Sequence, residues 1–179
     1  AVMLFEAAAL FLSRRCGEAG LLFIDFRAAF PSILHGWIRL TLAATGLPQS
    51  FVVAFMSLYA EVTAAIRFGS CPAASLAMRS GIRQGCPASG AIFAICIDPL
   101  LRMIGSWLPS PWSRLVAYAD DIAIAVQHLF KALLKLASAF ALYLAESCLA
   151  VNPQKTVVIP LWKGGCFDCK WWLFDCLPC

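Results

Sequence analysis

Three aspartates stand at positions where chemistry is possible. Asp25 ends the apolar run at residues 21–24, and Asp120 and Asp121 are neighbours in the apolar stretch at residues 115–126. Carboxylates among buried strands are costly unless something pairs with them, and adjacent like charges raise that cost. A divalent cation relieves the repulsion, and two Mg²⁺ ions about 3.5–4 Å apart can clamp a phosphoryl transfer. The pattern indicates a site for Mg²⁺ or Mn²⁺, although a solvated turn also explains an Asp-Asp pair.

These carboxylates need strands to hold them in place. Residues 21–24 predict a buried strand that ends at Asp25, and residues 115–126 predict a hairpin with the Asp-Asp pair at its tip. Further strands are expected at residues 62–68, 76–79 and 157–161, and helices at residues 1–16, 31–40, 50–59, 91–101 and 129–150. Helices interleaved with local hairpins favour an α+β domain with an antiparallel sheet.

The composition fits a folded domain that has an unusually apolar content. The chain has 179 residues, of which 61% are hydrophobic and 13% are charged, so it has ample apolar surface to bury and is not disordered. Its net charge of +4 permits contact with nucleic acid without requiring it.

No segment matches a membrane span or a secretion signal. A spanning helix needs about 20 consecutive apolar residues. The charge-free run at residues 40–60 is broken at residues 46–50, and the run at residues 86–101 contains Asp98. The basic pair Arg14-Arg15 follows the first apolar stretch, which is the wrong order for a signal peptide. We therefore expect no membrane partner and no secretion.

The nine cysteines fall into two groups. The first group reads as small buried residues in a reducing compartment: Cys16, Cys71, Cys86, Cys96 and Cys148. The second group forms two CxxC pairs, whose thiolates could share one zinc ion: Cys166, Cys169, Cys176 and Cys179. A frayed or mis-joined chain end explains this second group as well.

Four segments together resemble the motifs of reverse transcriptases, in that family's order. They are LLFIDFRAAFPSILH at residues 21–35, GIRQGCPASGAIFAICIDPLLR at residues 81–102, LVAYADDIAIAV at residues 115–126 and VNPQKTVVI at residues 151–159. The residues of the second segment are most similar to the corresponding motif of the non-LTR retrotransposon (LINE-like) branch of the family. The resemblance implies a polymerase palm, with an antiparallel sheet packed on helices, that carries out RNA-directed DNA synthesis with Mg²⁺ or Mn²⁺.

The resemblance assigns catalytic roles by position. Asp25 and Asp120 match the main metal ligands, Asp121 matches a supporting carboxylate, and the backbone carbonyl of Phe26 would complete one metal's shell. Lys155 would face the triphosphate and could protonate the departing pyrophosphate; a solvated surface lysine remains the alternative.

Other positions match residues that contact nucleotide, template or primer. Phe30 matches the aromatic ring that excludes a 2′-hydroxyl, although ordinary core packing also explains it. Gln84 and Gly85 would meet the template base and the nucleotide, where a small residue lets the backbone approach closely. Tyr118 would support the metal-binding hairpin near the primer end.

The resemblance covers residues 1–161, which it identifies as a partial reverse transcriptase domain. This domain would consist of a palm with an incomplete remnant of the fingers and no thumb. Residues 162–179 form a Cys- and Trp-rich tail of unknown role. The implied partners are an RNA template, a DNA primer and deoxynucleoside triphosphates, with fingers, thumb and endonuclease regions in a longer polyprotein that is nuclear or cytoplasmic. The chain alone is expected to be an inactive fragment or remnant. The alternative function is a non-catalytic structural or RNA-binding module derived from a palm.

Overall fold

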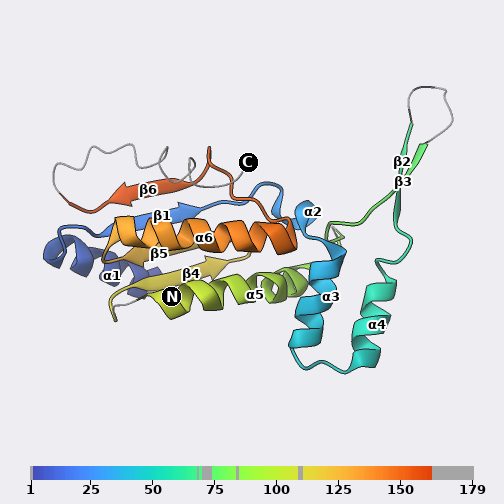
Figure 1. Cartoon of the computed structure of the whole chain (residues 1–179), viewed down its shortest axis with the longest axis horizontal. Helices are drawn as coiled ribbons and strands as arrows, with labels where there is room; N and C mark the ends of the chain where they lie inside the picture. Colours follow the sequence, from blue (N-terminus) through green and yellow to red (C-terminus); the bar gives the residue numbers. More distant parts are fainter. Residues whose placement is uncertain (1, 68, 70–73, 84, 109–110, 163–179) are drawn as a thin grey trace. The chain divides into compact units, whose positions relative to one another are not determined.

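The computed structural model describes residues 2–67, 69, 74–83, 85–108 and 111–162 (Figure 1). The chain divides into two compact units, of which one combines Ala1–Ala29 with Ile97–Cys179 and the other is Phe30–Cys96. Several residues singled out above lie outside the described part: Gln84, Cys71 and the four tail cysteines Cys166, Cys169, Cys176 and Cys179.

The first unit is built on a four-stranded antiparallel sheet. Its strands are β1 (Gly20–Ile24), β4 (Arg114–Tyr118), β5 (Asp121–Val126) and β6 (Val157–Pro160), in the order β4-β5-β1-β6. The expected strands and the expected hairpin are confirmed. The sheet places β1, from the start of the chain, between β5 and β6 from its second half (Figure 1).

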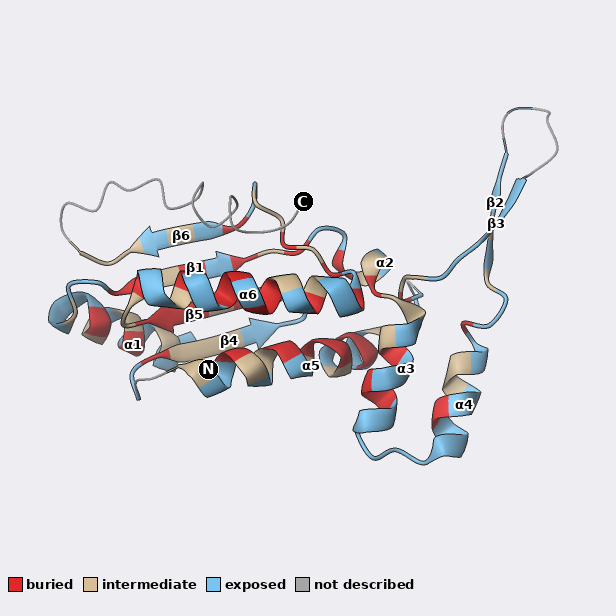
Figure 2. Cartoon of the chain, in the orientation of Figure 1, coloured by how far each residue is buried: buried red, intermediate tan, exposed pale blue. Residues whose placement is uncertain are grey.

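Helices cover the two faces of this sheet. Leu22 lies opposite Ile124 in the β1–β5 register, and both are fully buried under α6 (Leu129–Ser147) and the second half of α5 (Ser89–Trp107). Figure 2 shows this core as buried residues along β5, α5 and α6. The neighbouring Phe23 points to the other face, where Phe5 of α1 (Val2–Arg15) contacts it edge-on with ring centroids 6.3 Å apart.

The second unit contains α2 (Ala29–Ser32), which starts at the unit boundary, α3 (His35–Ala44), α4 (Gln49–Ser57) and the hairpin of β2 (Thr63–Ile66) with β3 (Ala74–Ala77). The expected single helix from residue 31 is wrong, because the structure divides it into α2 and α3. Leu34 between them is extended, with φ −64° and ψ 137°, and forms a β-bridge with Ser80. This strand-like pairing interrupts the helix.

Helix α5 is longer than expected and continues past Pro99 to Trp107. Within it, Arg102 Nε contacts Asp98 Oδ2 at 2.5 Å. Among the described residues, α5 is the helix that is long and apolar enough to cross a membrane by length and composition alone. One such helix is weak evidence for a span, because a core helix can pass the same test.

The cysteine prediction holds for Cys96 and fails elsewhere in the described part of the chain. Cys96 is fully buried, and burial raises the pKa of its thiol to about 11, against a smaller lowering by its contact with Thr41. Cys16 and Cys86 are half-buried and Cys148 is exposed. Cys148 caps the end of α6 in the left-handed conformation with φ 61°.

Candidate active site

Asp25 directly follows β1, and the register of the sheet determines what lies across from it. The last β1–β5 pair is Ile24 with Ile122, and the next residues along the two segments are Asp25 and Asp121, which both line one hollow. Side chains that lie opposite each other on antiparallel strands have Cβ atoms about 4.5–5.5 Å apart, and like charges in that position are destabilising. The fold therefore brings two carboxylates together at the end of the sheet where a cation would stabilise them.

The β4–β5 hairpin presents the Asp-Asp pair. Tyr118 pairs with Asp121, which leaves Ala119 and Asp120 as a two-residue turn. Ala119 has φ 52°, a left-handed conformation that is uncommon for a residue with a Cβ. Backbone strain of this kind concentrates at functional sites, and this turn carries two of the three predicted carboxylates.

A hollow of about 400 Å³ lies at this end of the sheet, and we call it the carboxylate hollow. It is lined by Phe23, Ile24, Asp25, Val116, Tyr118, Asp121, Ile122, Ala123 and Lys155. The first, third and fourth sequence motifs thus contribute to one site, and every lining residue belongs to the first unit.

The loop before β6 holds the backbone of Asp25. Asn152 N–H donates to Asp25 O at 2.8 Å, and Asp25 N–H donates to Thr156 Oγ1 at 3.4 Å. Thr156 is fully buried, and its own N–H donates to Asn152 O at 3.0 Å. This clasp also brings the neighbouring Lys155 to the hollow.

Sequence reasoning assigned no role to Asn152 or Thr156. The available signal was the Asn-Pro-Gln-Lys-Thr spacing, in which Gln154 N–H donates to Asn152 Oδ1 at 3.2 Å in a side-chain-stabilised turn. That pattern predicts a turn, but it does not show which strand the turn supports.

The donor set fits a divalent metal at two carboxylates. Asp25 Oδ2 is buried and has no hydrogen-bond partner among the described residues, so it is available as a ligand. Mg²⁺ is commonly held by one or two carboxylates, with waters and substrate phosphates filling the remaining positions. Asp25 and Asp121 supply such a pair.

The three carboxylates do not form a single cluster. Within the described residues, no three His, Cys, Asp or Glu side chains gather closely enough to hold a metal ion, and Asp120 does not line the hollow. The expected arrangement differs because Asp120 belongs to the two-residue turn, whereas Asp121 begins β5.

The remaining predicted residues of the first unit have clear positions. Tyr118 lines the hollow and is 83% exposed, so its ring is open to a partner. The side chain of Phe26 is buried and meets Phe140 edge-on, with ring centroids 6.1 Å apart. Any role of Phe26 toward a metal would therefore fall to its backbone carbonyl.

The predicted sugar and template residues belong to the second unit. Phe30 stacks on Phe93 with ring centroids 4.6 Å apart, and its carbonyl accepts a hydrogen bond from Ile82 N–H at 2.8 Å. Gly85 has φ 83°, a conformation that favours glycine. The structure thus joins the segment around Phe30 to the loop of the second motif.

The architecture defines a class of protein. An antiparallel sheet in the order β4-β5-β1-β6 is packed on helices, and acidic residues stand at the facing ends of β1 and β5. This is a polymerase palm-like fold. The apo telomerase of Candida tropicalis, truncated from its C-terminal domain, shares the fold with a TM-score of 0.71 at 14% identity, over 93% of this chain and 35% of that one.

Comparison with known families gives the particular assignment. The family model described as reverse transcriptase (RNA-dependent DNA polymerase) matches residues 4–162. The chain therefore belongs to the reverse transcriptase family.

The related proteins come from retrotransposons, which agrees with the predicted LINE-like branch. The transposon TX1 uncharacterized 149 kDa protein of Xenopus laevis is 34% identical over 67% of this chain and 10% of its own length. The Pol polyprotein from the type-2 retrotransposable element R2DM of Drosophila melanogaster is 29% identical over 56% of this chain and 10% of its own length. The Pol polyprotein from the type-1 retrotransposable element R2 of Popillia japonica is 25% identical over 76% of this chain and 23% of its own length. The chain thus spans about a tenth to a quarter of the length of these curated relatives.

Proposed function

We propose that this chain is the catalytic palm of an RNA-directed DNA polymerase of a non-LTR retrotransposon. The observation that carries the proposal is the carboxylate hollow, which both Asp25 and Asp121 line and where Asp25 Oδ2 has no hydrogen-bond partner among the described residues. Family membership supplies the reaction class, and the retrotransposon relatives support the biological setting.

Asp25 and Asp121 would hold a divalent ion such as Mg²⁺ or Mn²⁺, and Asp120 would join them if the strained turn at Ala119 rearranges. When bound, such ions neutralise phosphate charge and promote attack by a primer hydroxyl. The chain's own part is positioning, because the clasp of Asn152 and Thr156 fixes the backbone of Asp25.

Two further residues complete the site: Tyr118 at the end of β4 and Lys155 in the loop before β6. The Lys155 ammonium at the hollow would attract a triphosphate, and it could give a proton to the pyrophosphate oxygen as the bond to the α-phosphorus breaks. The exposed ring of Tyr118 offers a surface for the primer end. Phe30, Gln84 and Gly85 are proposed to contact the sugar and the template.

The partners that follow are an RNA template, a DNA primer and deoxynucleoside triphosphates. The fold neighbour from Candida tropicalis has also been solved in complex with a TWJ fragment of telomeric RNA, with a TM-score of 0.70 at 12% identity over 92% of this chain and 29% of that one. This supports a nucleic-acid partner for the present chain.

A second function, a non-catalytic palm that serves as a structural or RNA-binding module, is favoured by one observation. In the described part of the chain, Asp120 stands apart from the hollow and no group of three metal-binding side chains is formed. A palm that had lost catalysis would tolerate such an arrangement.

Primer extension distinguishes the two functions. The polypeptide expressed from the whole reading frame that encodes this chain is assayed with an RNA template, a DNA primer and Mg²⁺, next to Asp25→Asn and Asp98→Asn variants. Asp98 is an exposed carboxylate paired with Arg102, so it serves as the matched control. We expect extension that is lost in Asp25→Asn and kept in Asp98→Asn. Equal extension by all three proteins, or none by the unaltered protein, would reject catalysis at this site.

A further inference from the structure

A second cavity lies in the first unit, away from the carboxylate hollow. It measures about 440 Å³, and we call it the helix-face pocket. It is lined by Ile104, Trp107, Leu108, Ile124, Val126, Gln127, His128, Lys131, Ala132, Lys135 and Leu136. Cavities of about 300–1,000 Å³ are typical of small-molecule sites.

The pocket and the carboxylate hollow are lined by different residues of β5. Ile124 of β5 lines the helix-face pocket, whereas its neighbour Ala123 lines the hollow. The hollow takes residues 121–123 at the start of β5, whereas the pocket takes Ile124 and Val126 toward its other end and Gln127 just after it, and the two cavities share no lining residue. A ligand of the helix-face pocket would therefore not occupy the nucleotide site.

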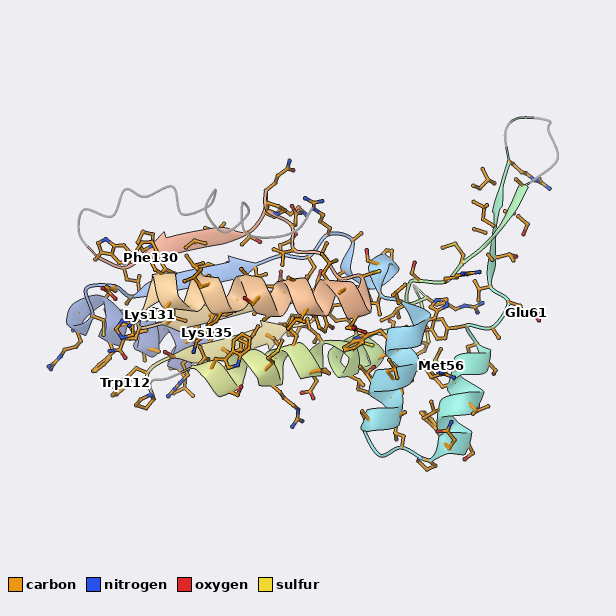
Figure 3. The ribbon with its side chains drawn as sticks, viewed as in Figure 1. Met56, Glu61, Trp112, Phe130, Lys131 and Lys135 are labelled. Atoms are coloured by element: carbon orange, nitrogen blue, oxygen red, sulfur yellow. The ribbon has the colours of Figure 1, made fainter. Side chains whose placement is uncertain are left out.

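The pocket has an apolar floor and a basic rim. Ile104, Ile124 and Leu136 are buried side chains of α5, β5 and α6. Lys131 and Lys135 stand one helical turn apart on α6, and Figure 3 shows both between α6 and α5. Like charges at this spacing repel one another, and an anion between them would relieve the repulsion.

The charges around the rim are unbalanced. No acidic residue lines the pocket, and neither lysine forms an ion pair within the described residues. His128 is already matched, since its Nδ1 lies 3.0 Å from Glu18 Oε2. Two ammonium groups therefore remain at the mouth of an apolar cavity.

We propose that the helix-face pocket binds an amphipathic anion, with an apolar chain or ring against Ile104, Ile124 and Leu136 and a carboxylate between Lys131 and Lys135. A medium-chain fatty acid has this chemistry. The site is independent of the proposed polymerase function, since it shares no lining residue with the hollow.

Equilibrium dialysis with radiolabelled decanoate and, separately, decanol tests the proposal. The full chain is carried as a soluble fusion protein, and the fusion partner alone is the blank. The charge variant is Lys131→Gln with Lys135→Gln, and its control is Arg14→Gln with Arg15→Gln on exposed positions of α1. The block variant is Ala132→Phe, which fills the pocket and keeps both lysines.

We expect saturable binding of decanoate at one site. The lysine variant should weaken decanoate binding about two- to thirtyfold, the range for two exposed ion pairs, and leave decanol binding unchanged. Ala132→Phe should weaken both ligands, and the arginine control should weaken neither. No saturable binding to the unaltered chain, or equal loss of decanoate in the lysine and arginine variants, would overturn the proposal. Because the lysines are exposed, the lysine comparison stands even if Ala132→Phe fails to fold.

Discussion

Asp25 combines a fixed backbone with an available carboxylate. Its N–H and C=O are engaged by Thr156 and Asn152, whereas Oδ2 is buried without a partner in the described part of the chain. Leaving a buried carboxylate oxygen unsatisfied is costly, and that cost is consistent with a site that awaits a cation.

Thr156→Val should weaken this support. The substitution keeps the shape of the side chain but removes the hydroxyl that accepts from Asp25 N–H, so we expect the free energy of unfolding to fall by about 1 kcal/mol. Chemical denaturation measures that loss, and primer extension by the complete polypeptide should slow in parallel. Thr156→Ser keeps the hydroxyl and should restore the extension rate; if it does not, the hydrogen bond is not what positions Asp25.

Phe30→Ala should relax sugar selection if the ring excludes a 2′-hydroxyl. The ring also stacks on buried Phe93, so its loss should lower the free energy of unfolding by about 2–3 kcal/mol. Extension with ribonucleotides in place of deoxynucleotides measures selection, and Phe30→Tyr, which keeps the ring, is the control. Unchanged selectivity in Phe30→Ala would leave Phe30 with a packing role alone.

The sequence predicts some of the site residues but not others, for a physical reason. Asp25, Asp120 and Asp121 attract attention because charge among apolar strands is costly, and two of them line the hollow. Thr156 is neutral and is fully buried, and the local spacing around it predicts a turn but not its hydrogen bond with Asp25. The separation of Asp120 from Asp121 depends on where the turn ends and β5 begins, and sequence patterns do not fix such boundaries.

At the scale of elements, local sequence patterns predict most strands and helices, but they miss a break in a helix that is caused by a contact with a residue far along the chain. The expected helix from residue 31 breaks because Leu34 bridges Ser80, 46 residues later along the chain. A similar long-range contact holds Gly81, whose N–H donates to Ile33 O at 2.8 Å. No local signal near Leu34 announces either contact.

Gly81→Ala should destabilise the second unit. Gly81 has φ 98°, and a Cβ there would lie 3.1 Å from the backbone oxygen of Pro31, so we expect a loss of about 1–2 kcal/mol. Gly36→Ala is the matched control: it lies in α3 with no atom within 4 Å of the added Cβ, and it should gain up to about 1 kcal/mol. Thermal unfolding should move the two midpoints in opposite directions, and a shift in the same direction would contradict this account of Gly81.

At the scale of the whole molecule, the fold class follows from the sequence, but the order of the strands does not. Alternating and apolar runs predict the strands, whereas placing β1 between β5 and β6 requires contacts about 100 residues apart or more. The resemblance to reverse transcriptases implied an antiparallel sheet packed on helices but not the order of its strands. The helix-face pocket was not predictable, because it arises where α5, α6 and β5 pack together.

The 179-residue chain alone should not extend a primer. Among the described residues, Lys155 is the cation that lines the carboxylate hollow, and Lys131 and Lys135 lie at the other cavity, so these residues offer few phosphate contacts near the site. Large apolar side chains are also exposed, such as Met3 and Leu142, which favours aggregation. Primer extension and size-exclusion chromatography of the purified chain measure both properties. Robust extension that an Asp120→Ala variant abolishes would show that the chain is self-sufficient.

The most direct test of the central claim is the binding of Mn²⁺, used as a spectroscopic substitute for Mg²⁺, to the chain in its soluble fusion form without nucleic acid. Electron paramagnetic resonance measures free Mn²⁺ in titrations of the unaltered protein and of the Asp25→Asn, Asp121→Asn and Asp98→Asn variants. Because Asp25 and Asp121 line one hollow at the end of the sheet, we predict binding that Mg²⁺ competes away. The affinity should fall at least about tenfold in Asp25→Asn and Asp121→Asn, and stay unchanged in Asp98→Asn. Mn²⁺ binding that is the same in all four proteins, or absent from the unaltered one, would contradict a metal site in the carboxylate hollow.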